Sequence, residues 1–359
     1  MDKKRKLSTI LLLSVIIISL VAGLQNVELV KADSKTIIVP TDYLTIQDAI
    51  DNAVEGDTIY VKKGVYVENP VVNKTVSLVG EDRDATVIDV TAGLKVESNR
   101  VTITGFTIYD GWRGISLSGN QCKISGNKIT NATNGIVLFG CENSITGNIF
   151  LSIGLSSAIQ LNFANRNLVN KNYIDSCIEG IQIWQSSNNN TITENTIIGC
   201  QDHAIRFQYS NDNKVIGNNI TRSGCGTSIY GSNWNVISYN NYVDNAFQFS
   251  TNEDYYLSFG NNASINTIER NYWSDYNGID ANDDGTGDVP YVIDEKNKDN
   301  YPYMKPVSTP NSIIPNTSPS NPNPTPTTPE LTTLVILPVF ISMLIIAMII
   351  KLRKKGNVT

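Results

Sequence analysis

Glu179, Asp202 and Arg206 are the residues of this chain with the clearest potential for acid–base chemistry. Two carboxylates roughly 5–10 Å apart can supply the acid and the base of glycoside hydrolysis. A lyase would instead need a calcium-bound acidic sugar and a basic residue, such as Arg206 or Arg113, as proton acceptor. No recognisable catalytic motif surrounds these residues, and each carboxylate alone is typical of a turn. His203, the only histidine, is expected to be an exposed turn side chain.

A second set of residues could bind sugars. Short segments such as Gly135–Leu138 and Gly180–Ile183 have the alternation of strands, which gives each an inward and an outward face. Two outward rows are predicted, one of Val137, Gln160, Gln182 and Arg206 and one of Phe139, Asn162, Trp184 and Gln208. Rings stack on pyranose faces and amides bond to hydroxyls, so the rows predict a carbohydrate-binding surface. The alternative is an ordinary polar sheet face with a few exposed rings.

A third set could hold a metal ion. Oxygen-bearing residues recur at alternate positions of an acidic loop, and they are Asp280, Asn282, Asp284, Thr286 and Asp288. With Gly285 at the sixth position, this spacing resembles a calcium loop. Tyr291 replaces the usual bidentate Glu at position 12, so the loop is no EF-hand, and Asp294 or Asp299 is expected to complete the shell. A calcium ion bound here would stabilise the C-terminal cap. The alternative is an acidic turn that is simply solvated.

The elements that must position these residues are repeats. Between Val101 and Trp273 the motif Asn-x-apolar-x-x-Asn returns about every 22 residues. Its clearest copies are Asn143-Ser-Ile-Thr-Gly-Asn148, Asn167-Leu-Val-Asn-Lys-Asn172, Asn190-Thr-Ile-Thr-Glu-Asn195, Asn213-Lys-Val-Ile-Gly-Asn218 and Asn235-Val-Ile-Ser-Tyr-Asn240. A fixed period of this size indicates a solenoid, in which each repeat buries its apolar face against its neighbours. Asn suits the tight corners between short strands, and identical Asn side chains can bond in stacks.

The predicted fold is therefore all-β, a parallel β-helix of eight to ten coils. Inward ladders are expected from Ile115, Ile136, Ile159, Ile181 and Ile205, and from Leu117, Leu138, Leu161, Ile183 and Phe207. A helix over 45–53, with Thr45 as N-cap, is predicted to cover the N-terminal end. Residues 37–98 would form this cap and the first coils, 101–270 the repeats and 271–306 a C-terminal cap.

The five cysteines leave at least one without an intramolecular partner. Cys177, Cys200 and Cys225 are spaced by 23 and 25 residues, about one repeat, so they are expected to stack in neighbouring coils. Adjacent strands lie about 4.8 Å apart, which is within disulfide range. A column of buried thiols is the alternative.

The ends of the sequence predict export and membrane anchoring. Residues 1–32 resemble a signal peptide, with an uncleaved anchor as the alternative. Residues 307–330 are a Pro/Ser/Thr/Asn-rich stalk, 331–350 form an apolar stretch long enough to span a membrane, and 351–359 are a basic cytoplasmic tail. Sequons in the part between fit a glycoprotein. Residues 33–330 carry 19 basic against 32 acidic side chains, a net charge of −13 that argues against nucleic acid as a partner.

Several motifs also resemble a known family. Thr45-Ile-Gln-x-Ala-Ile50, Gly64-Val-Tyr-x-Glu68 and Asn271-Tyr-Trp-Ser-Asp-Tyr276 are similar to segments of NosD-like β-helix proteins, and the repeats resemble the carbohydrate-binding and sugar-hydrolase β-helix domain. The resemblance implies a right-handed parallel β-helix. The resemblance implies copper handling, but copper prefers His, Cys or Met donors. This chain has one His and four Met, so copper is expected only if Cys177, Cys200, Cys225 and His203 act together.

The sequence thus predicts a membrane-anchored protein outside the cytoplasm that binds a polysaccharide or another cell-envelope polymer on one face of the solenoid. A polysaccharide hydrolase or lyase on the same face is the alternative. A copper-handling accessory protein and a purely structural protein are lesser alternatives.

Overall fold

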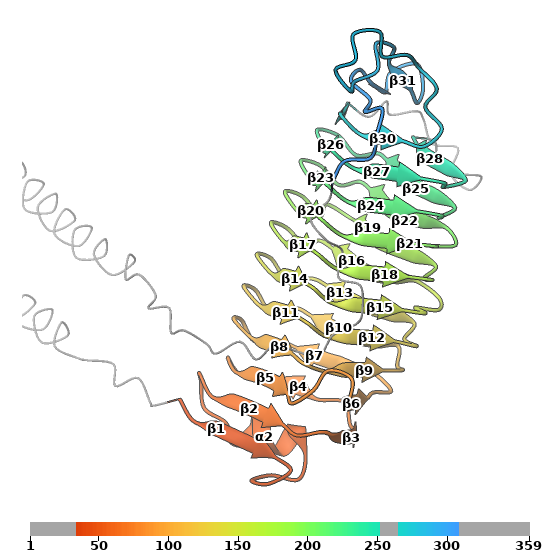
Figure 1. The fold of residues 1–359 in the computed structure, drawn as a ribbon. Coiled ribbons are helices and arrows are strands. Elements are labelled where there is room, and N and C mark those ends of the chain that lie inside the picture. Colours follow the sequence, from red (N-terminus) through yellow and green to blue (C-terminus); the bar gives the residue numbers. More distant parts are fainter. Residues whose placement is uncertain (1–33, 252–264, 309–359) are drawn as a thin grey trace, which may run out of the picture. The chain divides into compact units, whose positions relative to one another are not determined.

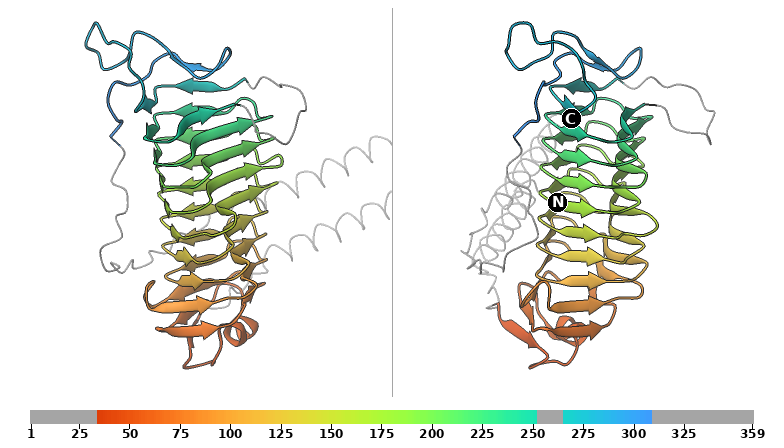
Figure 2. Two further views of the ribbon diagram at one scale, coloured as in Figure 1. Left: turned by 90° about the vertical axis from the view of Figure 1, so that its right-hand side faces the viewer. Right: turned by 45° about the vertical axis from the view of Figure 1, so that its right-hand side comes forward.

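The computed structural model describes residues 34–251 and 265–308. They form a parallel β-helix of about ten turns, as predicted. Each turn contributes one short strand to each of three sheets of eleven, ten and nine strands (Figure 1). Figure 2 shows the strands of successive turns lying one above another in the same direction.

The three parallel sheets contain the following strands. The eleven-stranded sheet consists of β1 (Thr36–Val39), β2 (Thr58–Val61), β5 (Ser77–Gly80), β8 (Thr102–Thr104), β11 (Lys123–Ser125), β14 (Ser144–Thr146), β17 (Leu168–Asn170), β20 (Thr191–Thr193), β23 (Lys214–Ile216), β26 (Val236–Ser238) and β29 (Thr267–Glu269). The ten-stranded sheet consists of β3 (Gly64–Val67), β6 (Thr86–Asp89), β9 (Thr107–Tyr109), β12 (Lys128–Thr130), β15 (Ile149–Leu151), β18 (Tyr173–Asp175), β21 (Thr196–Ile198), β24 (Asn219–Thr221), β27 (Asn241–Val243) and β30 (Tyr272–Trp273). The nine-stranded sheet consists of β4 (Val71–Val72), β7 (Leu94–Val96), β10 (Arg113–Leu117), β13 (Asn134–Leu138), β16 (Ser157–Asn162), β19 (Glu179–Trp184), β22 (His203–Gln208), β25 (Cys225–Tyr230) and β28 (Phe247–Ser250).

The core consists of stacked inward side chains. Both predicted ladders of the nine-stranded sheet are confirmed, because the register pairs Ile159 with Ile181 and Leu161 with Ile183, and the neighbouring strands continue both series. Every member of the two ladders is fully buried. The alternation of apolar and polar residues within each short strand therefore fixes the register between turns.

Two ladders of asparagine side chains run inside the solenoid at its corners. In the longer one, the Oδ1 atom of each Asn accepts hydrogen bonds from the backbone N–H and the Nδ2 atom of the Asn one turn earlier, as between Asn172 and Asn195 at 2.9 and 3.0 Å. Its members are Asn127, Asn148, Asn172, Asn195, Asn218, Asn240 and Asn271. The predicted stacking is confirmed.

The left-handed backbone that makes each corner, however, is adopted by a different residue. Left-handed backbone is found at the residue before each of these Asn, such as Lys171 with φ 54° and Glu194 with φ 54°. The Asn side chain therefore serves the ladder, while the preceding residue makes the bend.

Both ends of the solenoid are covered. Helix α2 (Ile46–Asn52) lies at the N-terminal end beside β1 and β2 (Figure 1), with Ile46, Ala49 and Ile50 buried and Thr45 accepting from the backbone of Asp48 at 3.0 Å. This confirms the predicted capping helix. At the other end, β31 (Tyr291–Val292) and β32 (Lys298–Asp299) form an antiparallel pair, and the ring of Trp273 is stacked between Tyr242 and Tyr291.

The predicted cysteine column is only partly right. Cys177 and Cys200 are buried, and the backbone of Cys200 donates to the hydroxyl of Ser223, which continues their column. Cys225 pairs in register with His203 instead, because the longer spacing of 25 residues moves it past the turn and into a strand. None of the five cysteines forms a disulfide.

The predicted signal peptide, the membrane-spanning stretch 331–350 and the basic tail lie outside the described residues, as does the stalk beyond residue 308. Among the described residues, no helix is both long and apolar enough to cross a membrane.

Candidate functional site

The outward face of the nine-stranded sheet carries the predicted sugar-binding rows. The register aligns Val137, Gln160, Gln182 and Arg206 in one row, and Asn162, Trp184 and Gln208 in the next, so the predicted alignment is confirmed. Phe139, directly after β13, lies at the end of the second row. The predicted exposure is wrong for Val137 and Gln182, which are only 1% and 8% exposed. Nε2 of Gln160 donates to Oε1 of Gln182 at 2.5 Å.

A further outward row was not anticipated, and it lies at the first residue of each strand. Its register pairs are Ser157 with Glu179 and His203 with Cys225. Glu179 and His203 are therefore strand residues and not turn residues. Each is only 7% exposed, which corrects the prediction that His203 is an exposed turn side chain. The strands simply begin earlier than their apolar alternation indicates.

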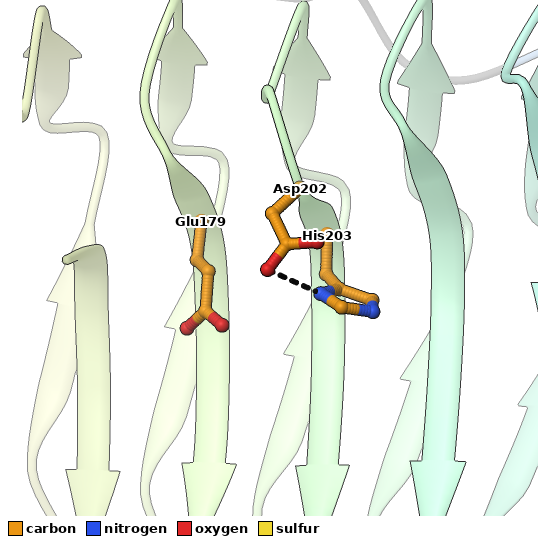
Figure 3. Close-up of side chains that lie close together, drawn as sticks. All are labelled: Glu179, Asp202 and His203. Atoms are coloured by element: carbon orange, nitrogen blue, oxygen red, sulfur yellow. Dashed lines mark ion pairs between the residues drawn. The ribbon is translucent and has the colours of Figure 1, made fainter. Parts of the chain in front are cut away.

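The three acid–base candidates come together around His203. Nη1 of Arg206 lies 2.7 Å from Oε1 of Glu179, and the Ser157 hydroxyl donates to Oε2 of Glu179 at 2.9 Å. Asp202 immediately precedes β22, and its Oδ2 atom lies 3.1 Å from Nδ1 of His203 (Figure 3). One ligand-type atom from each of Glu179, Asp202 and His203 lies within 4.8 Å of the other two. The two carboxylates are thus closer than the expected range of roughly 5–10 Å.

The carboxyl group of Asp202 is influenced by the two basic side chains of this cluster, His203 and Arg206. Contact with the His203 imidazole, aided by Arg206, lowers the pKa of the Asp202 carboxyl, and partial burial opposes this shift. Nδ1 of His203 lies 3.1 Å from Oδ2 of Asp202, but it has no hydrogen-bond partner of normal geometry in the described part of the chain. A buried polar atom without a partner costs free energy unless water or a ligand bonds to it.

Other orphaned polar atoms lie on the same face. Six buried side-chain atoms of the described residues lack a hydrogen-bond partner, and four of them belong to outward positions of the nine-stranded sheet. These four are Nε of Arg113, Oδ1 of Asn162, Nδ1 of His203 and Oγ of Ser228. The guanidinium of Arg113 also lies over the Phe139 ring, 5.7 Å from its centroid. The face therefore offers both donors and acceptors that the protein itself leaves unused.

Three aromatic residues beside these rows were missed by the sequence reasoning. Phe163 and Tyr209 directly follow β16 and β22, adopt left-handed backbone and are exposed. Tyr230 continues the row of Trp184 and Gln208, and its ring meets that of Tyr209 edge-on at 5.2 Å. The signal was available, since each of the three aromatic residues lies at or just past the end of a strand of the same sheet.

The acidic loop is built from turns. Both carboxylate oxygens of Asp280 accept backbone N–H groups, from Asp284 at 3.1 Å and Gly285 at 2.8 Å. Asp284 accepts from the backbone of Thr286, Asp288 accepts from that of Ala281, and Asn282 bonds to Asp284. Asp299 cannot complete a calcium shell, because it is fully buried and occupied by N–H donors. Calcium binding by this loop stays a prediction.

Comparison with known proteins places the chain in a family. The sequence model of the family described as "Periplasmic copper-binding protein (NosD)" matches residues 50–278, which is more than half of the chain. The chain belongs to the NosD family. No curated protein sequence matches this NosD family member.

Solved structures share the fold of this NosD family member. A PL6 alginate lyase in complex with a trisaccharide is 14% identical with a TM-score of 0.53, and the match covers 71% of this chain and 63% of that one. The PL6 family alginate lyase AlyGC is also 14% identical, with a TM-score of 0.50 and coverage of 67% and 38%. An alginate lyase from Paenibacillus sp. str. FPU-7 is 15% identical with a TM-score of 0.48, covering 65% of this chain and 97% of that chain. At these identities the likeness concerns the fold alone.

The family description names copper, and the cysteine thiols of the described residues do not form a site that fits this metal. The cluster of Glu179, Asp202 and His203 contains no cysteine. Burial raises the pKa of the Cys177 thiol to about 12 and raises that of Cys200 as well, so both thiols are protonated at neutral pH, whereas metals bind the thiolate form. Cys225 lies in register with His203 but in a different column from the other two. The set of Cys177, Cys200, Cys225 and His203 therefore does not converge as copper handling would require.

Proposed function

We propose that the outward face of the nine-stranded sheet binds an extended polysaccharide or another polymer of the cell envelope. The observation that carries the proposal is the combination of aligned amides, arginines and rings with orphaned polar atoms on this one face. Successive turns lie about 4.8 Å apart, so each row presents similar groups at regular intervals. A polymer with a repeating unit can make the same contact at each interval.

The rings and the polar atoms have complementary roles. Trp184, Phe139 and Tyr230 offer apolar faces on which sugar rings can stack, and aromatic side chains are the usual anchors of binding surfaces. Asn162 and Ser228 offer polar atoms that have no partner in the described protein and to which hydroxyls can bond. The trisaccharide bound to the PL6 alginate lyase neighbour is consistent with a saccharide ligand for this fold.

The expected location of the protein in the cell follows from the two ends of its sequence. Export by the signal peptide 1–32 and anchoring by the stretch 331–350 would hold the solenoid outside the cytoplasm, with the chain passing the cell membrane once. This arrangement would place the binding face among envelope polymers.

The test is retention of the protein by immobilised polysaccharides, with the variant Trp184→Ala. Trp234→Ala is the matched control, since Trp234 is an exposed tryptophan in the turn before β26, away from the rows. We expect Trp184→Ala to weaken binding at least tenfold, about 1.4 kcal/mol, and Trp234→Ala to leave it unchanged. Equal binding by Trp184→Ala and the wild type would refute the proposal, as would the absence of retention on a broad panel.

A polysaccharide hydrolase or lyase on the same face is the second candidate. It is favoured by the convergence of Glu179, Asp202, His203 and Arg206 beside the rows. Carboxylate oxygens within 4.8 Å suit the separation of about 5–5.5 Å in retaining glycosidases better than the 6.5–9.5 Å of inverting ones. New reducing ends or unsaturated products that disappear with Asp202→Asn would support this candidate, and retention without products would support binding alone.

A further inference from the structure

Three metal-capable side chains converge at one place of the solenoid. Within residues 34–251 and 265–308, Glu179, Asp202 and His203 are the one set of three His, Cys, Asp or Glu residues whose ligand-type atoms lie within 4.8 Å of one another. They come from adjacent turns, since Glu179 begins β19 while Asp202 and His203 lie at the start of β22. Figure 3 shows Nδ1 of His203 directed toward the Asp202 carboxylate, with Glu179 on the neighbouring strand.

A second observation points to a missing ligand. His203 is 93% buried, being 7% exposed, and its Nδ1 atom has no hydrogen-bond partner in the described chain although it is aimed into the cluster. A neutral imidazole nitrogen is among the commonest metal ligands in proteins. An ion coordinated by this nitrogen would give it the well-aligned partner that the Asp202 carboxylate, 3.1 Å away, does not provide.

The electrostatics of the cluster suit a dication. Two carboxylates and the guanidinium of Arg206 leave one net negative charge when the imidazole is neutral, so a dication reverses this charge to a single positive one. Each oxygen of Glu179 already accepts one hydrogen bond, from Arg206 or from Ser157, but a carboxylate oxygen has a second lone pair. Arg206 and Ser157 would then orient Glu179 as a ligand, in the way that outer partners orient metal-binding carboxylates.

We propose that Glu179, Asp202 and His203 form a binding site for one divalent transition-metal ion, such as Zn²⁺. One imidazole and two carboxylates are a borderline donor set, whereas Mg²⁺ and Ca²⁺ prefer oxygen donors alone. Three protein ligands leave a coordination position open for water or another small ligand. The Asp202 side chain is 54% exposed, which gives the ion a path from solvent.

The experiment uses the fact that His203 is the only histidine of the chain. The full chain, purified without a polyhistidine tag and freed of metal by a chelator, is titrated with Zn²⁺ while the imidazole signals are followed by NMR. We expect these signals to shift until one equivalent is added, and to remain unchanged with Mg²⁺ or Ca²⁺. Cu²⁺ should displace Zn²⁺ from the same site, because it binds nitrogen and oxygen donors more tightly.

Variants assign the other two ligands. Glu179→Gln keeps the shape of the buried side chain, and Asp202→Asn changes a largely exposed one, so both should fold. Each is expected to lower the affinity for Zn²⁺ at least tenfold, whereas Asp212→Asn, which changes an exposed acid in the corner between β22 and β23, should not. The proposal would be overturned if the imidazole signals did not shift at saturating Zn²⁺, or if both carboxylate variants bound Zn²⁺ with the affinity of the wild type. No saccharide is present, so the result is independent of polymer binding.

Discussion

Replacing Asp299 by Asn should uncouple the C-terminal cap from the solenoid. The Asp299 carboxylate is fully buried and ends the longer asparagine ladder. Its Oδ1 atom accepts from the backbone of Arg270 at 2.9 Å and of Tyr301 at 3.0 Å. Its Oδ2 atom accepts from the backbone and Nδ2 of Asn271, at 2.9 and 3.3 Å, and from Nε1 of Trp273 at 3.1 Å.

The magnitude follows from the amide that Asp299→Asn introduces. An amide keeps one oxygen, and the less costly orientation places its NH₂ group at the Oδ1 position, where two N–H donors lose their acceptor. Each buried donor without a partner costs about 1–3 kcal/mol. Arg270 and Tyr301 are partly exposed, so water can compensate in part, and we expect the free energy of unfolding to fall by about 2–3 kcal/mol.

Urea denaturation followed by tryptophan fluorescence measures this loss. Trp273 is the only one of the four tryptophans that is fully buried, and it bonds to Asp299, so its emission reports on the cap. Asp283→Asn is the control, because Asp283 is exposed and its left-handed backbone suits Asn. If Asp299→Asn and Asp283→Asn were equally stable, the carboxylate would not be holding the cap and the reasoning would be wrong.

Two further predictions concern thiols and calcium. Iodoacetamide at pH 8 should modify the half-buried Cys141 and spare Cys177 and Cys200 until the protein unfolds, as mass spectrometry can show; rapid labelling of Cys177 in the folded protein would contradict its burial. Burial raises the pKa of Cys177 from 9.0 to about 12, so the folded state holds this proton more tightly than the unfolded chain does, and stability should decline as pH rises from 9.0 towards 12. If the acidic loop binds Ca²⁺, the ion at 100 times its dissociation constant should stabilise the protein by about 2.7 kcal/mol, and Asp284→Ala should abolish this gain; an unchanged melting temperature in Ca²⁺ would leave the loop as a solvated turn.

The solenoid was predictable because its information is local and repeated. Ile159 and Ile181 occupy the same position in consecutive repeats, and alternation within each strand assigns them to the inside, so register follows from spacing alone. The Asn ladder was predictable for the same reason. Cys225 shows the limit of this reasoning, since two extra residues after Cys200 were enough to move it from a turn column into a strand.

The candidate site was predictable in its membership but not in its environment. The sequence places Gln182, Trp184 and Arg206 on one outward face. It does not reveal that Arg206 reaches back to Glu179, or that His203 is buried, because these depend on side chains from different turns folding over one another. The role of Asp299 was missed for a similar reason, since its partners precede it by up to 29 residues and share no motif with it.

The asparagine ladder has a direction, and this direction bears on how such chains change in length during evolution. At each step of the ladder the backbone N–H donates to the following turn, and the Oδ1 atom that accepts it faces the preceding one, from Phe106, which donates to Asn127, to the acceptor Asp299. After loss or duplication of one whole repeat, the N–H donor of one turn would therefore again meet the Oδ1 atom of an Asn in the next turn. Phe106 and Asp299 would still end the ladder. Among the described residues, the cluster around His203 comes from the turns of β16, β19 and β22, so repeats outside them are the ones that insertion or deletion can alter at little cost to this cluster.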